Sequence, residues 1–92
     1  MKKLEGKVAV ITGAAVGLGK GIATVYAKYG AKLCMIDLLP EVEETAKELR
    51  EKYNTEIVTY IGDVSKKDNM EEAVNKAVEK FGEVNVACCN AG

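Results

Sequence analysis

The glycine-rich segment Thr12–Gly19 (TGAAVGLG) has the residue types and spacing with the most evident chemistry. It follows an apolar, β-branched run at 7–11 and precedes an amphipathic stretch whose apolar residues recur at helical spacing: Leu18, Ile22, Val25 and Tyr29. At a strand-to-helix turn the first helical amides lack carbonyl partners, so they can bind a pyrophosphate without a basic side chain. Glycines allow the phosphates to come close. The segment predicts a dinucleotide site with contacts from Gly13, Ala15, Val16, Gly17, Leu18 and Gly19.

An acidic residue stands where such a site needs one. Asp37 follows Gly19 by 18 positions and ends a second apolar run. A carboxylate there can accept hydrogen bonds from both hydroxyls of the adenosine ribose, and it would repel a 2′-phosphate. No arginine stands at Leu38 or Leu39 to neutralise that phosphate, which favours NAD over NADP. The alternative is that Asp37 is a solvated strand-end residue that starts a turn.

Apolar runs and amphipathic segments alternate along the chain. The pattern predicts strands near 7–12, 32–37, 56–61 and 84–89, separated by helices near 18–29, 40–53 and 66–81. This β-α-β-α-β-α-β order predicts an α/β fold with a parallel sheet and a ligand at the carboxyl ends of its strands.

Helix boundaries and buried faces can also be predicted. Gly30 is expected just after the first helix, Pro40 in the first turn of the second, and Ser65 as N-cap of the third. The apolar face of the second helix comprises Val42, Ala46, Leu49 and Tyr53. The expected buried stripe of the third helix comprises Met70, Ala73, Val74, Ala77, Val78 and Phe81.

Composition excludes several classes of protein. The 92 residues include 13 basic and 14 acidic side chains, and this balance argues against a nucleic-acid partner. No apolar stretch is long enough for a signal peptide or a membrane span, so we expect a cytoplasmic protein. The three cysteines, Cys34, Cys88 and Cys89, occur without any histidine and predict small core residues and no metal site.

The glycine spacing Gly13-x-x-x-Gly17-x-Gly19 resembles that of the short-chain dehydrogenase/reductase family, and so do three later segments. These segments are Asp63-Val64, Lys80–Val84 and Asn90-Ala91-Gly92. The resemblance implies a Rossmann-like, doubly wound sheet with strand order 3-2-1-4. It also implies adenine contacts from Asp63 and Val64, and a segment beneath the cofactor formed by Asn90, Ala91 and Gly92. The chain departs from the family pattern at Cys89 and Asn85, where asparagine and aspartate are usual.

In this family the chemistry rests on a serine and a Tyr-x-x-x-Lys pair. None of the four tyrosines here has a lysine four positions later. The resemblance therefore implies that residues 1–92 are the NAD-binding N-terminal part of an oxidoreductase of alcohols or ketones. This part is incomplete relative to the family, and we expect that it cannot catalyse hydride transfer alone.

Two alternative functions stay open. One is a non-catalytic dinucleotide-binding module or truncated paralogue. The other, an S-adenosylmethionine-dependent methyltransferase, leaves Asp63-Val64 unexplained. The family topology would leave the strand near 84–89 at an open edge, so we expect the isolated chain to self-associate, and the parent enzyme to be a homo-oligomer.

Overall fold

Four parallel strands form the centre of the protein, in a computed structural model that describes residues 3–89. The elements follow the chain as β1 (Val8–Thr12), α1 (Gly17–Lys28), β2 (Lys32–Asp37), α2 (Glu41–Tyr53), β3 (Ile57–Ile61), α3 (Lys67–Phe81) and β4 (Val86–Cys88). The strand order is β3-β2-β1-β4, which confirms the predicted α/β class, the alternation and the topology. All seven elements begin and end within two residues of the prediction, and the shortest of them, β4, has three residues.

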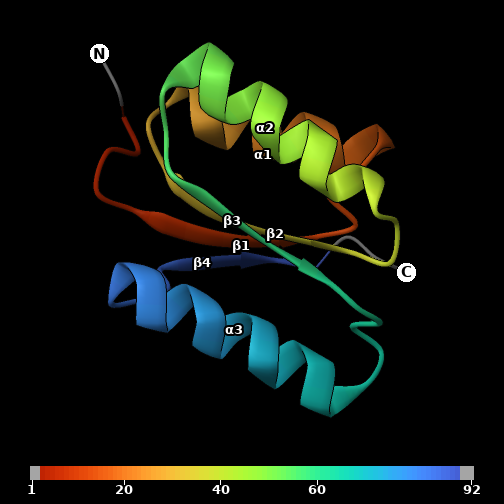
Figure 1. Ribbon diagram of the computed structural model, residues 1–92. Helices are drawn as coiled ribbons and strands as arrows, with labels where there is room; N and C mark the ends of the chain where they lie inside the picture. Colours follow the sequence, from red (N-terminus) through yellow and green to blue (C-terminus); the bar gives the residue numbers. More distant parts are fainter. Residues whose placement is uncertain (1–2, 90–92) are drawn as a thin grey trace.

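The helices cover the two faces of the sheet. Helices α1 and α2 lie on one face and α3 lies on the other (Figure 1). Strand β1 is buried along its whole length because it pairs with β2 and β4 and is covered from both sides. Its β-branched sequence, VAVIT, suits this position.

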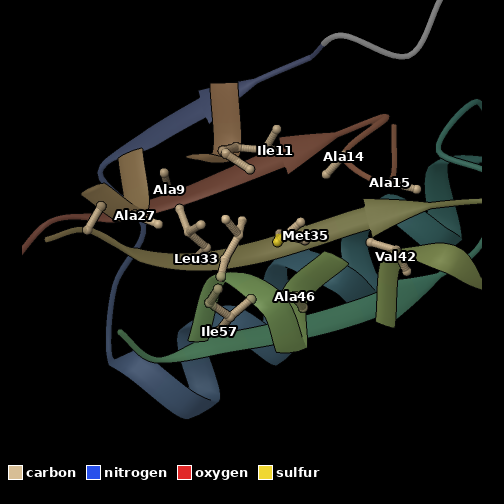
Figure 2. Packing of buried hydrophobic residues seen from close by; sticks show 13 residues of the cluster. Ala9, Ile11, Ala14, Ala15, Ala27, Leu33, Met35, Val42, Ala46 and Ile57 are labelled. Carbon is tan, nitrogen blue, oxygen red and sulfur yellow. The ribbon is translucent and has the colours of Figure 1, made fainter. Parts of the chain in front are cut away.

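Alternate residues of the strands enter two separate cores. Ile11, Leu33 and Met35 point to the face covered by α1 and α2, and Figure 2 shows them with Val42 and Ala46 of α2. Val10, Cys34 and Ile36 point to the opposite face and pack against Ala73 and Ala77 of α3. This alternation is the two-residue period of a strand, and it makes both faces of the central strands apolar.

The helix after the glycine loop buries a different face from the one that its large apolar residues suggest. Gly19, Ala23 and Ala27 are buried, whereas Leu18 is 71% exposed and Val25 is 50% exposed. Small side chains on the buried face allow a helix to lie close to the sheet. The four-residue apolar stripe from Leu18 to Tyr29 is therefore not the core face of α1, and of its members Ile22 packs partly against the core.

The other two helices match the expected faces in part. Val42, Ala46 and Leu49 of α2 are buried as predicted, together with Thr45, which carries a hydroxyl. In α3 only Ala73 and Ala77 are buried, and Val78 is 42% exposed, so the predicted six-residue stripe was too wide. Helix α3 contacts β1, β2 and β3, and this position over the sheet leaves the outer side of the helix open.

The three helices end and begin close to the residues expected as their caps. Gly30 follows the C-cap of α1 with a φ of 92°, in agreement with the prediction. Pro40 is the N-cap of α2, one residue before its first turn. The N-cap of α3 is Lys66, without a side-chain cap bond. The prediction of Ser65 as N-cap was wrong because its hydroxyl donates to Asp63 instead.

The cysteines lie in three different environments. Cys34 is buried in the α3-side core, Cys88 is half-buried, and Cys89 is exposed one residue beyond β4. Burial raises the pKa of the Cys34 thiol to about 11. The expectation of a small core residue therefore holds for Cys34 and is wrong for Cys89. Among residues 3–89, no three metal-ligating side chains converge and no helix is long and apolar enough to cross a membrane.

Candidate functional site

The carboxyl ends of β1, β2 and β3 open onto a cavity of about 300 Å³. The surface of the cavity is mostly apolar, and two acidic residues, Asp37 and Asp63, are among those that line it. The described residues that line it are Thr12, Gly13, Ile36, Asp37, Leu38, Gly62, Asp63, Val64, Ser65, Met70 and Cys89. A concave apolar space with a few convergent polar groups is the usual form of a small-molecule site.

The glycine loop leads from β1 into α1 beside this cavity. Gly13 and Gly17 have φ values of 63° and 61°, a left-handed conformation that is costly for other residues. Helix α1 begins at Gly17, and its N-cap Val16 makes no side-chain cap hydrogen bond. Its first turn carries no acidic residue, whereas the first turn of α2 carries three glutamates. The first turn of α1 thus places no acidic side chain of its own at the positive end of the helix dipole.

Hydrogen bonds from neighbouring strands and helices hold the loop in place. The Ala15 amide donates to Asp37 Oδ2 at 2.9 Å, and the Ala14 amide donates to the Ile36 carbonyl at 3.2 Å. The Ala15 carbonyl accepts a hydrogen bond from the Thr45 hydroxyl at 2.8 Å. Ala14 and Ala15 are both buried beyond the carboxyl end of β1 (Figure 2). The loop is therefore shaped by β2 and α2 before any ligand binds.

Asp37 is half-buried at the end of β2, and its two carboxylate oxygens have different partners. Oδ2 accepts the Ala15 amide, and Oδ1 accepts the Leu39 amide at 3.1 Å. Its carbonyl accepts the Gly62 amide at 3.0 Å, which joins the ends of β2 and β3. Two main-chain amides therefore orient this carboxylate at the rim of the cavity, where it can still accept further hydrogen bonds through its other lone pairs.

Asp63 forms a tight turn after β3. Its Oδ1 accepts hydrogen bonds from the Ser65 amide at 2.9 Å and the Ser65 hydroxyl at 2.6 Å. The hydroxyl bond is the largest cause that holds the pKa of Asp63 below its usual range, followed by the amide bond. Asn69 of α3 donates to the Asp63 carbonyl at 3.2 Å. The turn therefore presents an ionised carboxylate at the cavity.

The structure brings four of the residues singled out from the sequence to one cavity, and the others lie in the glycine loop or outside the described residues. Gly13, Asp37, Asp63 and Val64 line one cavity. Val16, Gly17 and Leu18 are exposed at the start of α1, whereas Ala15 and Gly19 are buried and shape the loop from within. Asn90, Ala91 and Gly92 lie outside the described residues.

Seven lining residues were missed by sequence reasoning, namely Thr12, Ile36, Leu38, Gly62, Ser65, Met70 and Cys89. Leu38 and Ser65 could have been found because each lies beside or close to a predicted carboxylate. Met70 comes from α3, and only the packing of that helix on the opposite face of the sheet brings it to the cavity. Its apolar side chain fits the helical periodicity of the core and carries no signal of a ligand.

The two residues that depart from the family pattern, Asn85 and Cys89, lie at opposite ends of β4. Asn85 joins the starts of β4 and β1. Its side-chain Oδ1 accepts the Val8 amide and its main-chain N–H donates to the Val8 carbonyl, both at 2.8 Å. It therefore stabilises strand pairing at the end of the sheet opposite to the cavity. Cys89 is exposed and lines the cavity itself.

Comparison with known proteins agrees with this arrangement. The sequence model of the short chain dehydrogenase family matches residues 7–92. Among curated relatives, oxidoreductase UcpA of Escherichia coli K12 is 39% identical over 92 residues, which cover 100% of this chain and 35% of that protein. A diacetyl reductase of Staphylococcus epidermidis is 47% identical over 87 residues, 94% of this chain and 34% of that protein. The chain thus spans about a third of the length of these relatives.

Solved structures have the same fold over the matched region. L-sorbose reductase of Gluconobacter frateurii, complexed with NADPH and L-sorbose, superposes with a TM-score of 0.93 at 32% identity, covering 99% of this chain and 35% of that one. Carveol dehydrogenase of Mycobacterium avium, in complex with NAD, gives a TM-score of 0.92 at 32% identity, covering 100% and 38%. With a family model that matches nearly its whole length, the chain belongs to the short-chain dehydrogenase family and corresponds to the NAD(P)-binding N-terminal region of its members.

Proposed function

We propose that this chain is the NAD-binding domain of an oxidoreductase that transfers hydride between the nicotinamide and an alcohol or ketone. The observation that carries the proposal is the cavity of about 300 Å³ between Asp37 and Asp63, next to the uncapped N-terminus of α1. An adenosine group in the cavity would place its pyrophosphate toward the glycine loop. Residues 1–92 then form one dinucleotide-binding domain, incomplete relative to the family.

The roles of the residues follow their positions. We assign the pyrophosphate contacts to the loop residues Gly13, Ala15, Val16, Gly17, Leu18 and Gly19. The Ala15 amide already donates to Asp37, so Ala15 contributes through the shape of the loop, and the amides at the exposed start of α1, Val16 to Leu18, bind the pyrophosphate. Asp37 accepts the ribose hydroxyls, and Asp63 and Val64 contact the adenine. Leu38 and Met70 supply apolar walls to the same cavity. Asn90, Ala91 and Gly92 stay a prediction from the family pattern and are assigned to the segment beneath the cofactor.

The preference for NAD rests on charge. A 2′-phosphate would come close to the Asp37 carboxylate, and none of the described residues that line the cavity is basic. Similar proteins have been solved with either dinucleotide, NADPH for L-sorbose reductase and NAD for carveol dehydrogenase, so the fold alone favours neither. The Asp37 carboxylate at the rim therefore favours NAD, which lacks the 2′-phosphate.

The proposal is tested by isothermal titration calorimetry of the 92-residue chain with NAD, NADP and ADP-ribose. We expect saturable binding of NAD and ADP-ribose, and binding of NADP at least about tenfold weaker, because one charge repulsion near the surface is worth about 1.4 kcal/mol or more. Failure of all three ligands to bind would overturn the assigned site. Equal affinities for NAD and NADP would overturn only the cofactor preference.

A non-catalytic dinucleotide-binding module is the second candidate, and it shares the same cavity and glycine loop. The two functions differ in hydride transfer, which is followed by nicotinamide absorbance with alcohols and ketones as substrates. A coding region downstream of Gly92 that carries a serine and Tyr-x-x-x-Lys would support the oxidoreductase. A stop codon there would support the module.

Compartment and assembly complete the proposal. Three free cysteines are typical of a reducing compartment, and we assign the protein to the cytoplasm. The parent oxidoreductase is expected to be a homo-oligomer, by analogy with its family. The isolated chain is expected to self-associate through β4, which lies at an edge of the described sheet.

A further inference from the structure

Thr45 makes an unusual contact for a hydroxyl in the middle of a helix. It is 6% exposed in α2, and its Oγ1 donates to the Ala15 carbonyl at 2.8 Å, across 30 residues of sequence. A helical threonine ordinarily donates to the carbonyl four residues earlier. Thr24 of α1 does this, with its hydroxyl 2.7 Å from the Lys20 carbonyl. The Thr45 hydroxyl instead links α2 to the glycine loop.

The hydrogen bond from Thr45 to the Ala15 carbonyl also fixes the direction of the Val16 amide. The Ala15 carbonyl and the Val16 amide belong to one planar trans peptide unit, so they point in opposite directions. Thr45 holds that carbonyl toward α2, and it thereby directs the Val16 N–H away from α2. Val16 is the exposed N-cap of α1, and its amide is among those at the positive end of the helix.

The preceding peptide is held independently. The Ala15 amide donates to Asp37 at 2.9 Å, and the Ala14 amide donates to Ile36. Both of these bonds come from β2, whereas the Thr45 bond comes from α2 and acts on the other side of the Ala15 residue. The peptide units on both sides of Ala15 are therefore held by hydrogen bonds from two different elements.

We propose that Thr45 is a positioning residue for the phosphate-binding loop, which it orients through the Ala15–Val16 peptide without touching the dinucleotide. This role rests on the proposed dinucleotide-binding function. It assigns to α2 a part in pyrophosphate affinity, although α2 lies outside the loop and supplies none of the residues that line the cavity.

The test compares three variants of the 92-residue chain, Thr45→Val, Thr45→Ser and Thr24→Val. Valine keeps the shape of threonine and removes the hydroxyl, serine keeps the hydroxyl, and Thr24→Val removes a hydroxyl whose bond stays within its own helix. Each variant is titrated with NAD and with adenosine, which carries no phosphate. Backbone order parameters of Ala15, Val16 and Gly17 are measured without ligand by ¹⁵N relaxation.

We expect Thr45→Val to weaken NAD binding about threefold to tenfold, the effect of losing one neutral hydrogen bond, while adenosine binding stays unchanged. The order parameters of the loop should fall from about 0.85 toward 0.6 in this variant. Thr45→Ser and Thr24→Val should behave like the unchanged chain.

Two results would overturn the role of Thr45. Unchanged NAD affinity in Thr45→Val would show that the loop does not need the bond, and equal weakening for NAD and adenosine would show a general structural role. If the unchanged chain binds no NAD, the proposed function fails first. The order parameters then decide the positioning role alone, and unchanged values in Thr45→Val would overturn it.

Discussion

Asp37 Oδ2 accepts a hydrogen bond from the Ala15 amide at 2.9 Å, so the carboxylate at the end of β2 also holds the glycine loop that follows β1. The second oxygen, Oδ1, accepts the Leu39 amide at 3.1 Å. One side chain therefore contributes both to the shape of the loop and to the charge of the cavity, and variants at Asp37 must separate these two contributions.

Reversal of the charge at Asp37 should change cofactor choice. Asp37→Arg is expected to weaken NAD binding by about tenfold or more, since a hydrogen bond to a charged group is worth about 1.5–3 kcal/mol, and to improve NADP relative to NAD. Asp37→Asn keeps an oxygen that can accept the Ala15 amide, and it serves as the matched control with a preserved loop. Calorimetric titration of both variants checks this. Unchanged NAD affinity in Asp37→Arg would contradict the ribose contact.

Gly17 should tolerate a methyl group worse than Gly21, although both lie in α1 and neither has an atom within 4 Å of an added Cβ. The φ of Gly17 is 61°, so Gly17→Ala should lower the free energy of unfolding by about 1–2 kcal/mol. Gly21→Ala should raise it by up to about 1 kcal/mol, because alanine has the higher helix propensity. Urea unfolding measures both, and equal effects of the two substitutions would contradict the left-handed conformation.

Ser65 should control the ionisation of Asp63. Ser65→Ala removes the hydroxyl bond that is the largest cause of the lowered pKa, so the Asp63 pKa should rise toward its ordinary value. Lys66→Gln removes the smallest lowering cause and should raise the pKa less. Carboxyl ¹³C NMR titration gives both values. A larger rise in Lys66→Gln than in Ser65→Ala would contradict this order.

Ser65→Ala should also change how the free energy of unfolding depends on pH. A lowered folded pKa stabilises the fold when the pH lies above the unfolded aspartate pKa of about 3.9, and this stabilisation is lost as the pH falls through the folded pKa. The stability difference between the unchanged chain and Ser65→Ala should therefore be present at neutral pH and shrink on acidification. A difference that grows on acidification would have the wrong sign.

The thiols should react in order of exposure. Cys89 is exposed and should be alkylated first, whereas Cys34 is buried with a pKa of about 11 and offers almost no thiolate at pH 8. Mass spectrometry after timed alkylation should find Cys34 labelled only when the protein unfolds. The prior addition of NAD should slow Cys89, because Cys89 lines the proposed cofactor cavity.

Strand β4 should be a site of self-association. Its residues Val86, Ala87 and Cys88 are half-buried or exposed, and the strand pairs with β1 on one side. We expect oligomers at tens of micromolar in sedimentation velocity, and fewer in Ala87→Lys, because a lysine on an edge strand opposes pairing. Ala87→Ser, a small polar substitution at the same exposed position, is the control. A monodisperse monomer for the unchanged chain would contradict the prediction.

The amino-acid sequence by itself determined the class of fold and indicated where the candidate site should lie. Periods of two and of about 3.6 residues identify strands and helices directly, and glycines at Gly13, Gly17 and Gly19 followed by Asp37 mark a strand-to-helix turn and a strand end. These signals are local, and for that reason the element order and most boundaries agree with the structure. The strand order came from the family resemblance, and the structure confirms it.

The tertiary structure decided which faces are buried and which distant residues share the site. Helix α1 buries Gly19, Ala23 and Ala27 and leaves Leu18 exposed, because close packing on the sheet selects small side chains over large ones. Met70 reaches the cavity and Thr45 reaches the glycine loop only through the docking of α3 and α2. Contacts across 30 residues of sequence leave no periodic trace, since each depends on how two elements pack and not on the local pattern of either.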